Sequence, residues 1–487
     1  MATEKKLLRS KFFWVGVLYF AQGFPFGIFY DVLPVYFRQL GIDLREIGLL
    51  SLLGLAWTVK FLWAPAVDYY RHHRRWMLAV DLGMGACLIF LAAQAGFGPP
   101  VWIAIALFTL LSATNDIAID GYTIELLAKE ELGRANGFRI GFARGGILAA
   151  GVILILSDYL TWPGAYVAAA AVIALLGVVC LYAPRERDIV VVKQRLFLPR
   201  LLLAALALVL IGYAIQFGIR HGLDVVIEVS ASVANGIAVI VTVLLMATTA
   251  SLWLRRGSAR TPAPTVSAPL FSALAEMLKR PYILPVILFV LTFKLGDAAM
   301  GFMVKPYWVD SGFSATQIGL VSVNFGLVLS IAGGLAGGWF TDRVGIFKAL
   351  WVLGLFQAGS NLGYVWAASV IPLGAPGAAV PFEHQVMMYS ASALESFTGG
   401  LGTAAFLAFL MSIVSQRYSA AEYALLSSLF ALTRHLAGFA SGYGAHYLGY
   451  APYFLLTFFL SFPAYLLLPW VKKMLGYAES RKEWGQK

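Results

Sequence analysis

The sequence predicts an all-α polytopic membrane protein, built from two six-helix halves with two further helices between them, fourteen transmembrane helices in all. Composition is the first observation behind this class: the 487 residues are 60% hydrophobic and only 13% charged, with a mean hydropathy of +0.78. A water-soluble domain of this composition could not cover its own surface with polar groups. The second observation is a series of apolar runs of about 20 residues, each long enough to cross a bilayer once.

The third observation is an internal repeat, because a pattern near the N-terminus returns in the second half of the chain. Residues 34–37 (Pro-Val-Tyr-Phe) correspond to 306–309 (Pro-Tyr-Trp-Val). Residues 47–51 (Ile-Gly-Leu-Leu-Ser) correspond to 318–322 (Ile-Gly-Leu-Val-Ser). Each copy comes at the end of a long apolar stretch, so we interpret the chain as a duplicated membrane protein.

Each hydrophobic run is assigned to one span, and short polar or turn-forming segments separate the runs. The repeat pairs the first and second spans with the ninth and tenth. This pairing divides the chain into an N-terminal half at 1–190, two extra helices with a cytoplasmic linker at 191–280, and a C-terminal half at 281–487. In order, we expect spans at 12–37, 45–67, 76–95, 101–126, 135–157, 162–183, 197–219, 232–254, 281–307, 315–340, 347–369, 386–415, 421–446 and 451–474.

Lysine and arginine residues gather in alternate loops, which is the positive-inside pattern of membrane proteins. The loops on one side carry basic clusters, as do both termini, and the opposite loops are nearly free of such residues. We therefore expect both termini in the cytoplasm. The same distribution argues against a nucleic-acid partner despite the net charge of +11, because no single domain concentrates the basic residues. The exceptions on the opposite side are Arg38, Arg45, Arg220 and Lys305.

Segment 1–11 is too short for a cleaved leader, so we expect the first run to be a permanent span.

Several absences argue against an enzyme. Cys87 and Cys180 fall inside predicted spans and imply no disulfide framework. No phosphate-binding loop occurs, and the six His are scattered without metal-ligand spacing. We expect no cofactor and no metal, with an ion or cargo gradient as the energy source. A membrane acetyltransferase or a non-transporting receptor is the alternative of a different class.

A charged pattern follows the second span and returns after its counterpart, and it resembles the cytoplasmic signature of the major facilitator superfamily. The first copy contains Asp68 and Arg71, and the second contains Asp342 and Arg343. A carboxylate there can face a helix N-terminus or a partner arginine and hold the two halves together until they rock apart. Two copies in matching positions argue against a chance pattern in a solvated basic loop. We predict that these four residues form a cytoplasmic gate.

Six patches lie in order at 60–68, 115–120, 294–297, 359–364, 395–406 and 418–427. Together they resemble the AmpG family of muropeptide permeases within that superfamily. The resemblance implies proton-coupled import of anhydromuropeptides, for cell-wall recycling, by a carrier in a bacterial inner membrane. Its partners would be membrane lipid and an amphiphilic sugar-peptide, and we expect a monomer. Related siderophore permeases and acetyl-CoA transporters stay open as alternatives, because Asp31 departs from the family pattern.

Charged residues inside predicted spans are candidate functional residues, because a charge at mid-bilayer costs about 2.5 kcal/mol or more and needs a cavity or a partner. In the ninth span, Lys294 and Asp297 lie three residues apart on one helix face. Glu395 lies at a comparable depth in the twelfth span, before a glycine-rich run that permits close helix packing. We predict that Lys294 pairs with Asp297 or Glu395. A static ion pair that only fixes packing is the alternative.

The N-terminal half has its own charged residues. Asp116 and Asp120 lie four residues apart on one helix face, and Arg144 should reach a similar depth, so we predict an Asp116–Arg144 pair. Asp120 lies nearer the cytoplasm and belongs either to the gate around Arg71 or to the cavity. Asp31 is bracketed by aromatic residues in the first span. It would carry a proton in a dry setting, or be hydrated in the outer third of the span.

Polar and aromatic residues in the spans are candidate cargo contacts, because aromatic faces stack on sugars and amides satisfy their hydroxyl groups. The basic residues Arg144, Arg434 and Lys294 would hold the anionic end of a muropeptide. A single Asn or Gln in a membrane helix serves equally well as a packing hydrogen bond, and Arg434 could instead snorkel to the surface. The cavity candidates without a charge are Tyr30, Asn324, Gln357, Asn361 and Tyr364.

Overall fold

The computed structural model describes residues 10–184 and 276–484 apart from gaps at 61–62, 65–66, 68–71, 95–96, 128–130, 376–378 and 415–418. Contacts divide the chain into one unit of Met1–Asp188 with Pro269–Lys487 and another of Ile189–Ala268. The first unit holds all of the described residues. The predicted spans 197–219 and 232–254 lie outside the described residues, so the count of fourteen spans and the three-part division stay predictions.

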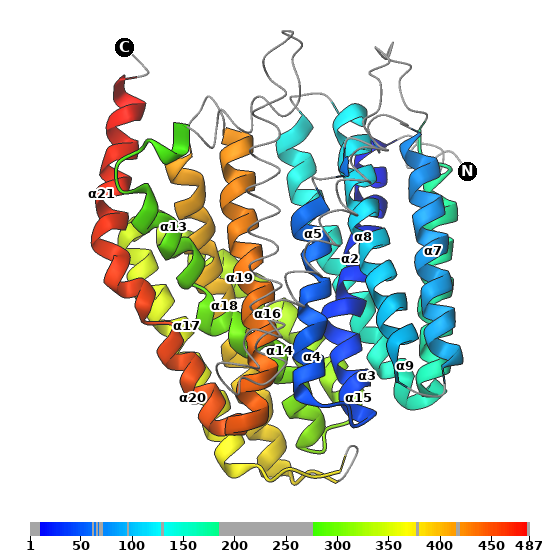
Figure 1. The fold of residues 1–487 in the computed structure, drawn as a ribbon. Helices are drawn as coiled ribbons and strands as arrows, with labels where there is room; N and C mark the ends of the chain where they lie inside the picture. The colour runs from blue at the N-terminus through cyan, green and yellow to red at the C-terminus, as the bar shows by residue number, and fades with distance from the viewer. Residues whose placement is uncertain are drawn as a thin grey trace, which may run out of the picture. The chain divides into compact units, whose positions relative to one another are not determined.

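The N-terminal half contains the first six predicted spans as helices (Figure 1). The first span is α2 (Lys11–Gly27), continued by the π-helical segment η1 (Ile28–Val32) and α3 (Leu33–Gln39). The next three are α4 (Leu44–Leu53) with α5 (Leu55–Val59), then α7 (His73–Ala93) and α8 (Pro99–Leu126). The last, α9 (Leu132–Cys180), holds both the fifth and the sixth span, and a kink at Thr161, whose backbone is non-helical at φ 61° and ψ 168°, separates the two.

The C-terminal half repeats this order. Its first span is α13 (Ile283–Thr292) with α14 (Leu295–Asp310), and its second is α15 (Ala315–Gln317), η4 (Ile318–Phe325) and α16 (Gly326–Val344). The others are α17 (Ile346–Val370), α18 (Phe382–Ile413), α19 (Ser419–Leu448), and α20 (Tyr450–Leu460) with α21 (Pro463–Trp484). Within the described ranges no β-strand is formed. The predicted all-α class and the two six-helix halves are therefore confirmed.

The internal repeat corresponds to a turn that both halves need. Gly41 follows α3 with φ +76°, and Gly312 follows α14 with φ +85°. This left-handed conformation costs an ordinary residue about 1–2 kcal/mol and glycine almost nothing. Each turn leads directly into a capped helix, in which Asp43 accepts a hydrogen bond from the Arg45 amide and Ser314 forms a capping box. The two glycines thus recur because the same hairpin begins each half.

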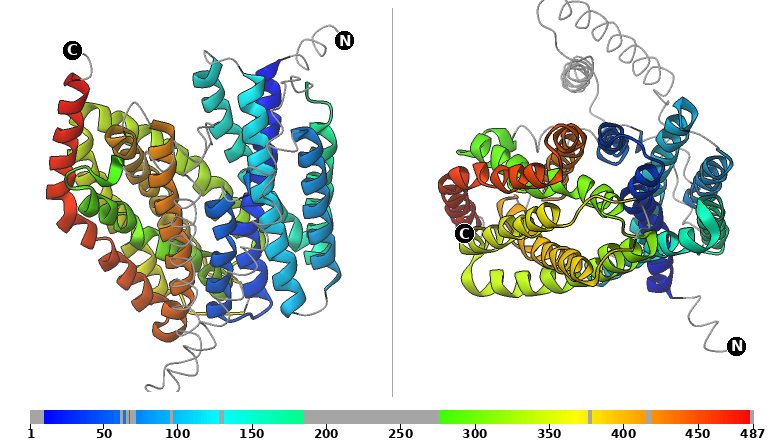
Figure 2. Two further views of the ribbon diagram at one scale, coloured as in Figure 1. Left: turned by 45° about the horizontal axis from the view of Figure 1, so that its top comes forward. Right: turned by 90° about the horizontal axis from the view of Figure 1, so that it is seen from below.

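The hydrophobic core is shared by the two halves at one end of this unit and divided at the other. One cluster joins Phe37 of the first half to Trp308 of the second. Toward the end where α2 begins and α21 ends, each half has a cluster of its own, around Trp14 and around Phe289. We call the shared end the closed end (residues 31–48, 305–319 and 442–450) and the opposite one the terminal end. Figure 1 shows α3 and α15 at the closed end, and Figure 2 shows the two halves side by side, the first in blue to green-cyan and the second in green to red.

Two helix crossings without side chains join the halves at the closed end. A Cβ atom on Gly442 of α19 would lie only 2.3 Å from the Leu44 carbonyl oxygen and 3.0 Å from the Gly48 Cα. A Cβ atom on Gly319 of η4 would lie 2.6 Å from the Gly151 carbonyl oxygen of α9. Gly48 and Gly319 hold the same place in the sequence repeat. Only glycine permits these backbones to approach so closely, as at other membrane-helix interfaces.

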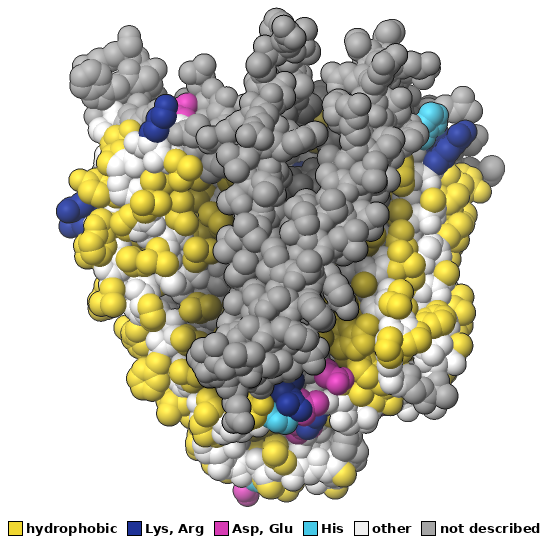
Figure 3. All heavy atoms as spheres, in the orientation of Figure 1, with side chains coloured by type: hydrophobic (Ala, Val, Ile, Leu, Met, Phe, Trp, Pro, Cys, Tyr) yellow, Lys and Arg dark blue, Asp and Glu magenta, His cyan; other side chains and the backbone are white. Residues whose placement is uncertain are grey.

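The surface agrees with a bilayer setting. Among the described helices, eight are long and apolar enough to cross a membrane. Hydrophobic side chains cover the described flanks in Figure 3, and charged side chains show mainly toward the two ends. A flank of this kind is stable in hydrocarbon and would aggregate in water.

Candidate functional site

A cavity of about 710 Å³ lies between the two halves. It brings together six of the seven predicted buried charges, and of those seven only Asp120 is outside its lining. The predicted cargo residues Tyr30 and Arg434 also line it. Aromatic rings on its wall include Phe26, Trp57 and Phe302. The charged lining consists of Asp31, Lys60, Asp116 and Arg144 from the first half and Lys294, Asp297, Lys305, Glu395 and Arg434 from the second.

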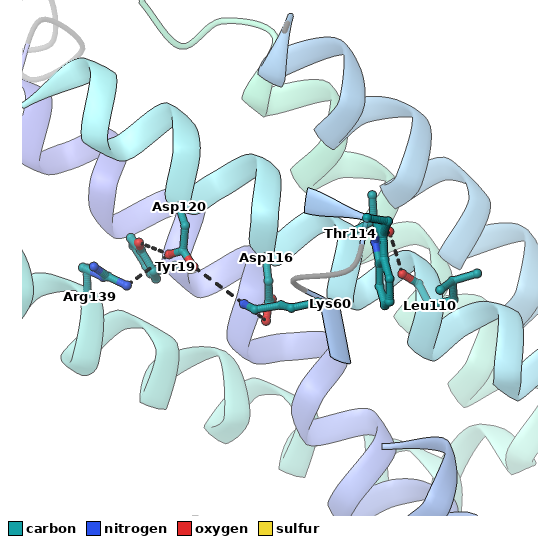
Figure 4. Close-up of polar contacts among 8 residues, drawn as sticks. Tyr19, Lys60, Leu110, Thr114, Asp116, Asp120 and Arg139 are labelled. Atoms are coloured by element: carbon teal, nitrogen blue, oxygen red, sulfur yellow. Dashed lines mark hydrogen bonds and ion pairs between the residues drawn. The ribbon is translucent and has the colours of Figure 1, made fainter. Parts of the chain in front are cut away.

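In the N-terminal half, Lys60 joins two carboxylates of α8 (Figure 4). Its Nζ atom lies 3.3 Å from Asp116 Oδ2 and 3.7 Å from Asp120 Oδ2. Asp120 also accepts hydrogen bonds from the Tyr19 hydroxyl at 2.6 Å and from Arg139 at 3.0 Å. The Arg139 guanidinium lies 4.6 Å from the centre of the Tyr19 ring. One lysine therefore serves a carboxylate on the cavity wall and a carboxylate already held by two other donors.

The predicted Asp116–Arg144 pair is wrong. Asp116 pairs with Lys60, which follows α5 and approaches α8 from the second span. Arg144 lines the same cavity, but within the part of the chain that the structure describes it forms no ion pair. Counting residues along the helices gave the depth of Asp116 and Arg144 in the membrane, but not the direction in which each side chain points around its helix. The residue that reaches Asp116 lay inside the first AmpG-like patch, where we assigned it no role.

In the C-terminal half, Lys294 occupies the break between α13 and α14 and is almost fully buried. Its Nζ atom donates to Gln357 Oε1 at 2.6 Å and to the Gly399 carbonyl at 3.3 Å, and it lies 3.5 Å from Asp297 Oδ2. The predicted pairing of Lys294 is thus confirmed for Asp297. Glu395 lines the same cavity but lies beyond the 4.0 Å limit of an ion pair with Lys294.

Asp31 lies in the π-helical segment η1 and meets a lysine of the opposite half. Lys305 Nζ is 3.5 Å from Asp31 Oδ1 and donates to the Ser322 hydroxyl at 2.7 Å. Single π-helical turns inside α-helices are frequent at functional sites. Asp31 is therefore part of a contact between the halves, and its role as a proton carrier stays a prediction.

A second contact between the halves lies at the closed end. Arg38 Nε is 2.5 Å from Asp310 Oδ1, and the Tyr450 hydroxyl donates to Asp310 Oδ2 at 2.6 Å. His446 Nδ1 lies 3.0 Å from Asp43 Oδ2. Arg38 and Asp310 each come four residues after the repeated proline, so equivalent positions of the two halves carry opposite charges. The repeat thereby generates an ion pair across the interface.

The four remaining cargo candidates lie at helix contacts and not on the cavity lining. Gln357 accepts the Lys294 hydrogen bond, and Asn361 donates to Thr457 Oγ1 at 3.3 Å. The Tyr364 hydroxyl accepts from Trp308 Nε1 at 3.4 Å. The Asn324 side chain lies over Gly151 at the second glycine crossing, where it fills the space that a Cβ would take. Packing, which was the alternative for these residues, accounts for them.

Only half of the predicted gate falls in the described residues. Asp68 and Arg71 lie outside them. Asp342 is exposed in the last turn of α16, and among the described side chains it has no ion-pair partner. The neighbouring Arg343 guanidinium lies 4.3 Å from the centre of the Trp339 ring. The gate itself therefore stays a prediction.

Sequence analysis missed five charged residues of the site: Lys60, Lys305, Arg38, Asp310 and Arg139. Two of them carried a signal, because Arg38 and Lys305 were conspicuous as basic residues on the otherwise neutral side. Their partners follow only from the way helices of opposite halves face each other. No three His, Cys, Asp or Glu side chains gather as a metal site would require, within the described ranges.

The sequence matches the family model described as Major Facilitator Superfamily over residues 15–380. The chain belongs to the Major Facilitator Superfamily. It is similar to the anhydromuropeptide permease of Escherichia coli, with 27% identity over 474 residues that cover 95% of this chain and 79% of that protein. It is also similar to the putative transporter AmpG 4 of Rickettsia conorii, with 22% identity, 94% of this chain and 95% of that protein. The resemblance to the AmpG permeases is thereby confirmed.

Solved structures agree on the fold of this major facilitator. The peptide transporter POT in complex with sulfate superposes with a TM-score of 0.66 at 13% identity, covering 95% of each chain. A bacterial homologue of the human lysosomal transporter Spinster gives 0.63 at 11% identity, covering 97% of this chain and 98% of its own. At such low identity the likeness concerns the fold alone. Family and cavity together make this chain a secondary membrane transporter and not an enzyme.

Proposed function

We propose that this major facilitator imports anhydromuropeptides into the bacterial cytoplasm in symport with protons. The observation that carries the proposal is the cavity between the halves, which combines lysine–aspartate pairs with aromatic rings. Similarity to the anhydromuropeptide permease over 95% of the chain supports the cargo class. No cofactor takes part in this proposal, the carrier acts as a monomer, and the proton gradient supplies the energy.

The cavity wall suits an amphiphilic sugar. Phe26, Tyr30 and Trp57 form one aromatic group, with the Tyr30 and Trp57 ring centres 5.9 Å apart and the Phe26 and Tyr30 centres 4.4 Å apart. Phe302 adds a ring from the opposite half, 5.7 Å from Tyr30. The flat apolar faces of pyranose rings stack on such groups. The volume of about 710 Å³ lies within the range of about 300–1,000 Å³ that small-molecule sites occupy.

Protons are carried by carboxylates whose lysine partners belong to the same half. Asp116 with Lys60 lies inside the first half, and Asp297 with Lys294 lies inside the second. When a carboxylate takes a proton, its lysine loses the attraction and turns to another acceptor. Such acceptors lie within reach: Asp120 for Lys60, and the Gln357 oxygen for Lys294. Proton uptake in this scheme therefore rearranges contacts within each half.

The proposed orientation of the carrier in the membrane rests on the positive-inside rule. Basic clusters and both chain ends belong to the cytoplasmic side in that rule, which assigns the terminal end to the cytoplasm of a bacterial inner membrane. The contacts between the halves lie at the opposite, closed end. In this proposal the described conformation is the one that releases cargo inward, with the outer side sealed.

The test is uptake of labelled N-acetylglucosaminyl-anhydromuramyl cargo by vesicles that contain the purified protein. With an inside-alkaline pH gradient we expect accumulation above the outside concentration, and without it only equilibration. Asp297→Asn should abolish the accumulation, because the proton acceptor of the second half is lost. Glu383→Gln is the matched control, since Glu383 is an exposed carboxylate at the start of α18.

Two outcomes would contradict parts of the proposal. Equal accumulation with and without the gradient would refute proton coupling and leave the cargo in place. If a thermal unfolding measurement shows that the protein is folded and it still takes up no labelled cargo, the proposed cargo class is refuted. Ferric siderophores and acetyl-CoA are then the next cargoes to compare in the same vesicles, because both belong to related carriers.

A further inference from the structure

On the cavity wall, the lysines have carboxylate partners and the arginines do not. Each of its three lysines faces an aspartate, at 3.3 Å, 3.5 Å and 3.5 Å. The two arginines, Arg144 and Arg434, have no acidic partner within 4.0 Å in the described part of the chain. Glu395 is the single carboxylate left outside the lysine pairs, and its hydrogen bond comes from the Ser396 hydroxyl at 3.3 Å. The cavity thus keeps two guanidinium groups without a counter-ion.

Arg434 is held in place by aromatic contacts. Its guanidinium carbon lies 4.4 Å from the centre of the Tyr30 ring and 5.9 Å from that of Phe26. A guanidinium stacked on a ring keeps its N–H groups in the plane, where they can form two parallel hydrogen bonds to one carboxylate. Tyr30 belongs to the opposite half, so Arg434 reaches across the cavity. Its position on the wall is fixed while its donors stay available.

Arg144 approaches from the other half in a matching way. On α9, Arg144 precedes Gly151 by two helical turns, and on α19, Arg434 precedes Gly442 by about the same distance. Both glycines form the crossings between the halves. Each arginine therefore lies on the face of its helix that is turned toward the opposite half, and the two like charges act on each other across the cavity.

We propose that Arg144 and Arg434 form an anion site that binds a carboxylate of the cargo and bridges the two halves. This inference rests on the proposed transport of anhydromuropeptides, which carry a lactyl or peptide carboxylate, and it names the part of the cargo that is recognised. Arginine suits this role better than the lysines nearby, because its planar fork matches both oxygens of a carboxylate. The three lysines already have aspartate partners.

The site also connects binding with movement. Without cargo, the repulsion between the two guanidinium groups opposes any approach of α9 and α19 around the cavity. A bound carboxylate neutralises this repulsion and attracts both helices to itself. An anionic cargo then lowers the free energy of the state in which the cavity is closed around it, whereas a neutral analogue does not.

The test compares the free acid of N-acetylglucosaminyl-anhydromuramic acid with its methylamide, by titration calorimetry on the purified full chain. We expect the wild-type protein to bind the acid about tenfold more tightly than the amide, which is the effect of one good charge-assisted hydrogen-bonding site. Arg144→Gln and Arg434→Gln should each remove most of this preference and leave the amide affinity unchanged. Arg75→Gln, at an exposed arginine in the first turn of α7, should keep the preference.

The outcomes separate the anion site from the cargo assignment. Equal binding of acid and amide by the wild-type protein would overturn the anion site and leave the muropeptide cargo intact. Binding of neither would contradict the cargo, and acetate and inorganic phosphate are then the probes. Thermal stabilisation by acetate that is lost in Arg144→Gln/Arg434→Gln would still support a carboxylate site. Stabilisation by phosphate alone, or by neither anion, would overturn it.

Discussion

Two kinds of ion pair occupy this transporter, and they differ in whether a movement of the halves must break them. Lys60–Asp116 and Lys294–Asp297 each lie within one half. Arg38–Asp310 and Lys305–Asp31 each join one half to the other. In a carrier whose halves rock as rigid bodies, that movement leaves pairs of the first kind intact and breaks pairs of the second kind once in every turnover.

The surroundings of the pairs within a half differ from those of Arg38–Asp310, whereas Lys305–Asp31 resembles the former, at 3.5 Å and with the Ser322 hydroxyl as a second acceptor. The pairs within a half are loose, at 3.3 Å and 3.5 Å, and each lysine has a second acceptor nearby. Arg38–Asp310 is short, at 2.5 Å, and is supported by the Tyr450 hydroxyl and by a continuous apolar core. A long ion pair whose lysine has a second acceptor suits an aspartate that gains and loses a proton. A short ion pair between the halves suits a contact that is formed in one conformation and absent in the other.

The largest effect is expected where the contact between the halves depends on backbone approach. Gly442→Val places a branched side chain where even a Cβ would lie 2.3 Å from the Leu44 carbonyl oxygen. The closed end can then no longer form, so we expect transport to be abolished and that end to stay open. Labelling of a cysteine introduced at the closed end by a membrane-impermeant maleimide should become fast in Gly442→Val vesicles.

Gly338→Ala is the matched control for this prediction. Gly338 also lies inside a membrane helix, but nothing lies within 4 Å of a Cβ built there. Transport and labelling should equal those of the wild-type protein. Wild-type uptake in Gly442→Val would show that the halves can pass one another without this crossing and would remove the distinction between the two kinds of contact.

The next effect concerns a pair within a half. Lys294 is 3% exposed and Asp297 25% exposed, so Lys294→Met leaves Asp297 and the Gln357 oxygen without their donor in a largely buried setting. Removal of one partner from a buried pair costs about 3–5 kcal/mol, and removal of both partners costs far less. We expect Lys294→Met to lower the unfolding temperature sharply and Lys294→Met/Asp297→Asn to recover most of it. Thermal unfolding in detergent measures both, and additive losses would mean that the pair is not coupled.

The architecture of this site was predictable where it depends on pattern along one helix. Lys294 and Asp297 lie three residues apart, so spacing offered Asp297 as one of two partners for Lys294, with Glu395 as the other. The glycine turns at Gly41 and Gly312 were visible as a repeat because both halves need the same backbone conformation. Membrane spans followed from length and hydropathy.

Contacts between different helices were beyond the sequence. Asp116 was assigned to Arg144 because both lie at a similar depth, yet depth does not give the rotation of a helix about its axis. Lys60 reaches Asp116 instead. The same lack of rotational information placed Asn324 and Asn361 in the cavity, although they lie at helix contacts. Arg38–Asp310 is a consequence of the approximate symmetry between the halves, which a list of spans does not contain.

A smaller effect is expected from reversing the tight pair between the halves. Arg38→Asp alone places two carboxylates together and should weaken the closed end, with a shift of the opening equilibrium of about 1–3 kcal/mol, or about 5–150-fold. Arg38→Asp/Asp310→Arg restores opposite charges and should recover part of the closed population. The same maleimide labelling reports both. If the double variant were as open as the single one, Asp310 would act through Tyr450 and not through Arg38.

The smallest effect belongs to Asp43, in the turn before α4 at the closed end. Partial burial alone would raise the pKa of Asp43, but the hydrogen bonds from Arg45 and the charge of His446 outweigh it and hold that pKa below its usual range. A lowered pKa in the folded protein means that the stabilisation is present above the ordinary aspartate value of about 4 and is lost as the pH falls through the lowered value.

Because the Asp43 carboxylate is about one-third exposed, its contacts should contribute only about 0.2–1 kcal/mol. Asp43→Asn keeps an oxygen for the helix cap and removes the charge. We expect the unfolding temperature of the wild-type protein to exceed that of Asp43→Asn slightly at pH 6 and the two to converge as the pH is lowered toward 3. A difference that does not change with pH would assign the effect to the cap and would leave His446 without a part in stabilising the closed end.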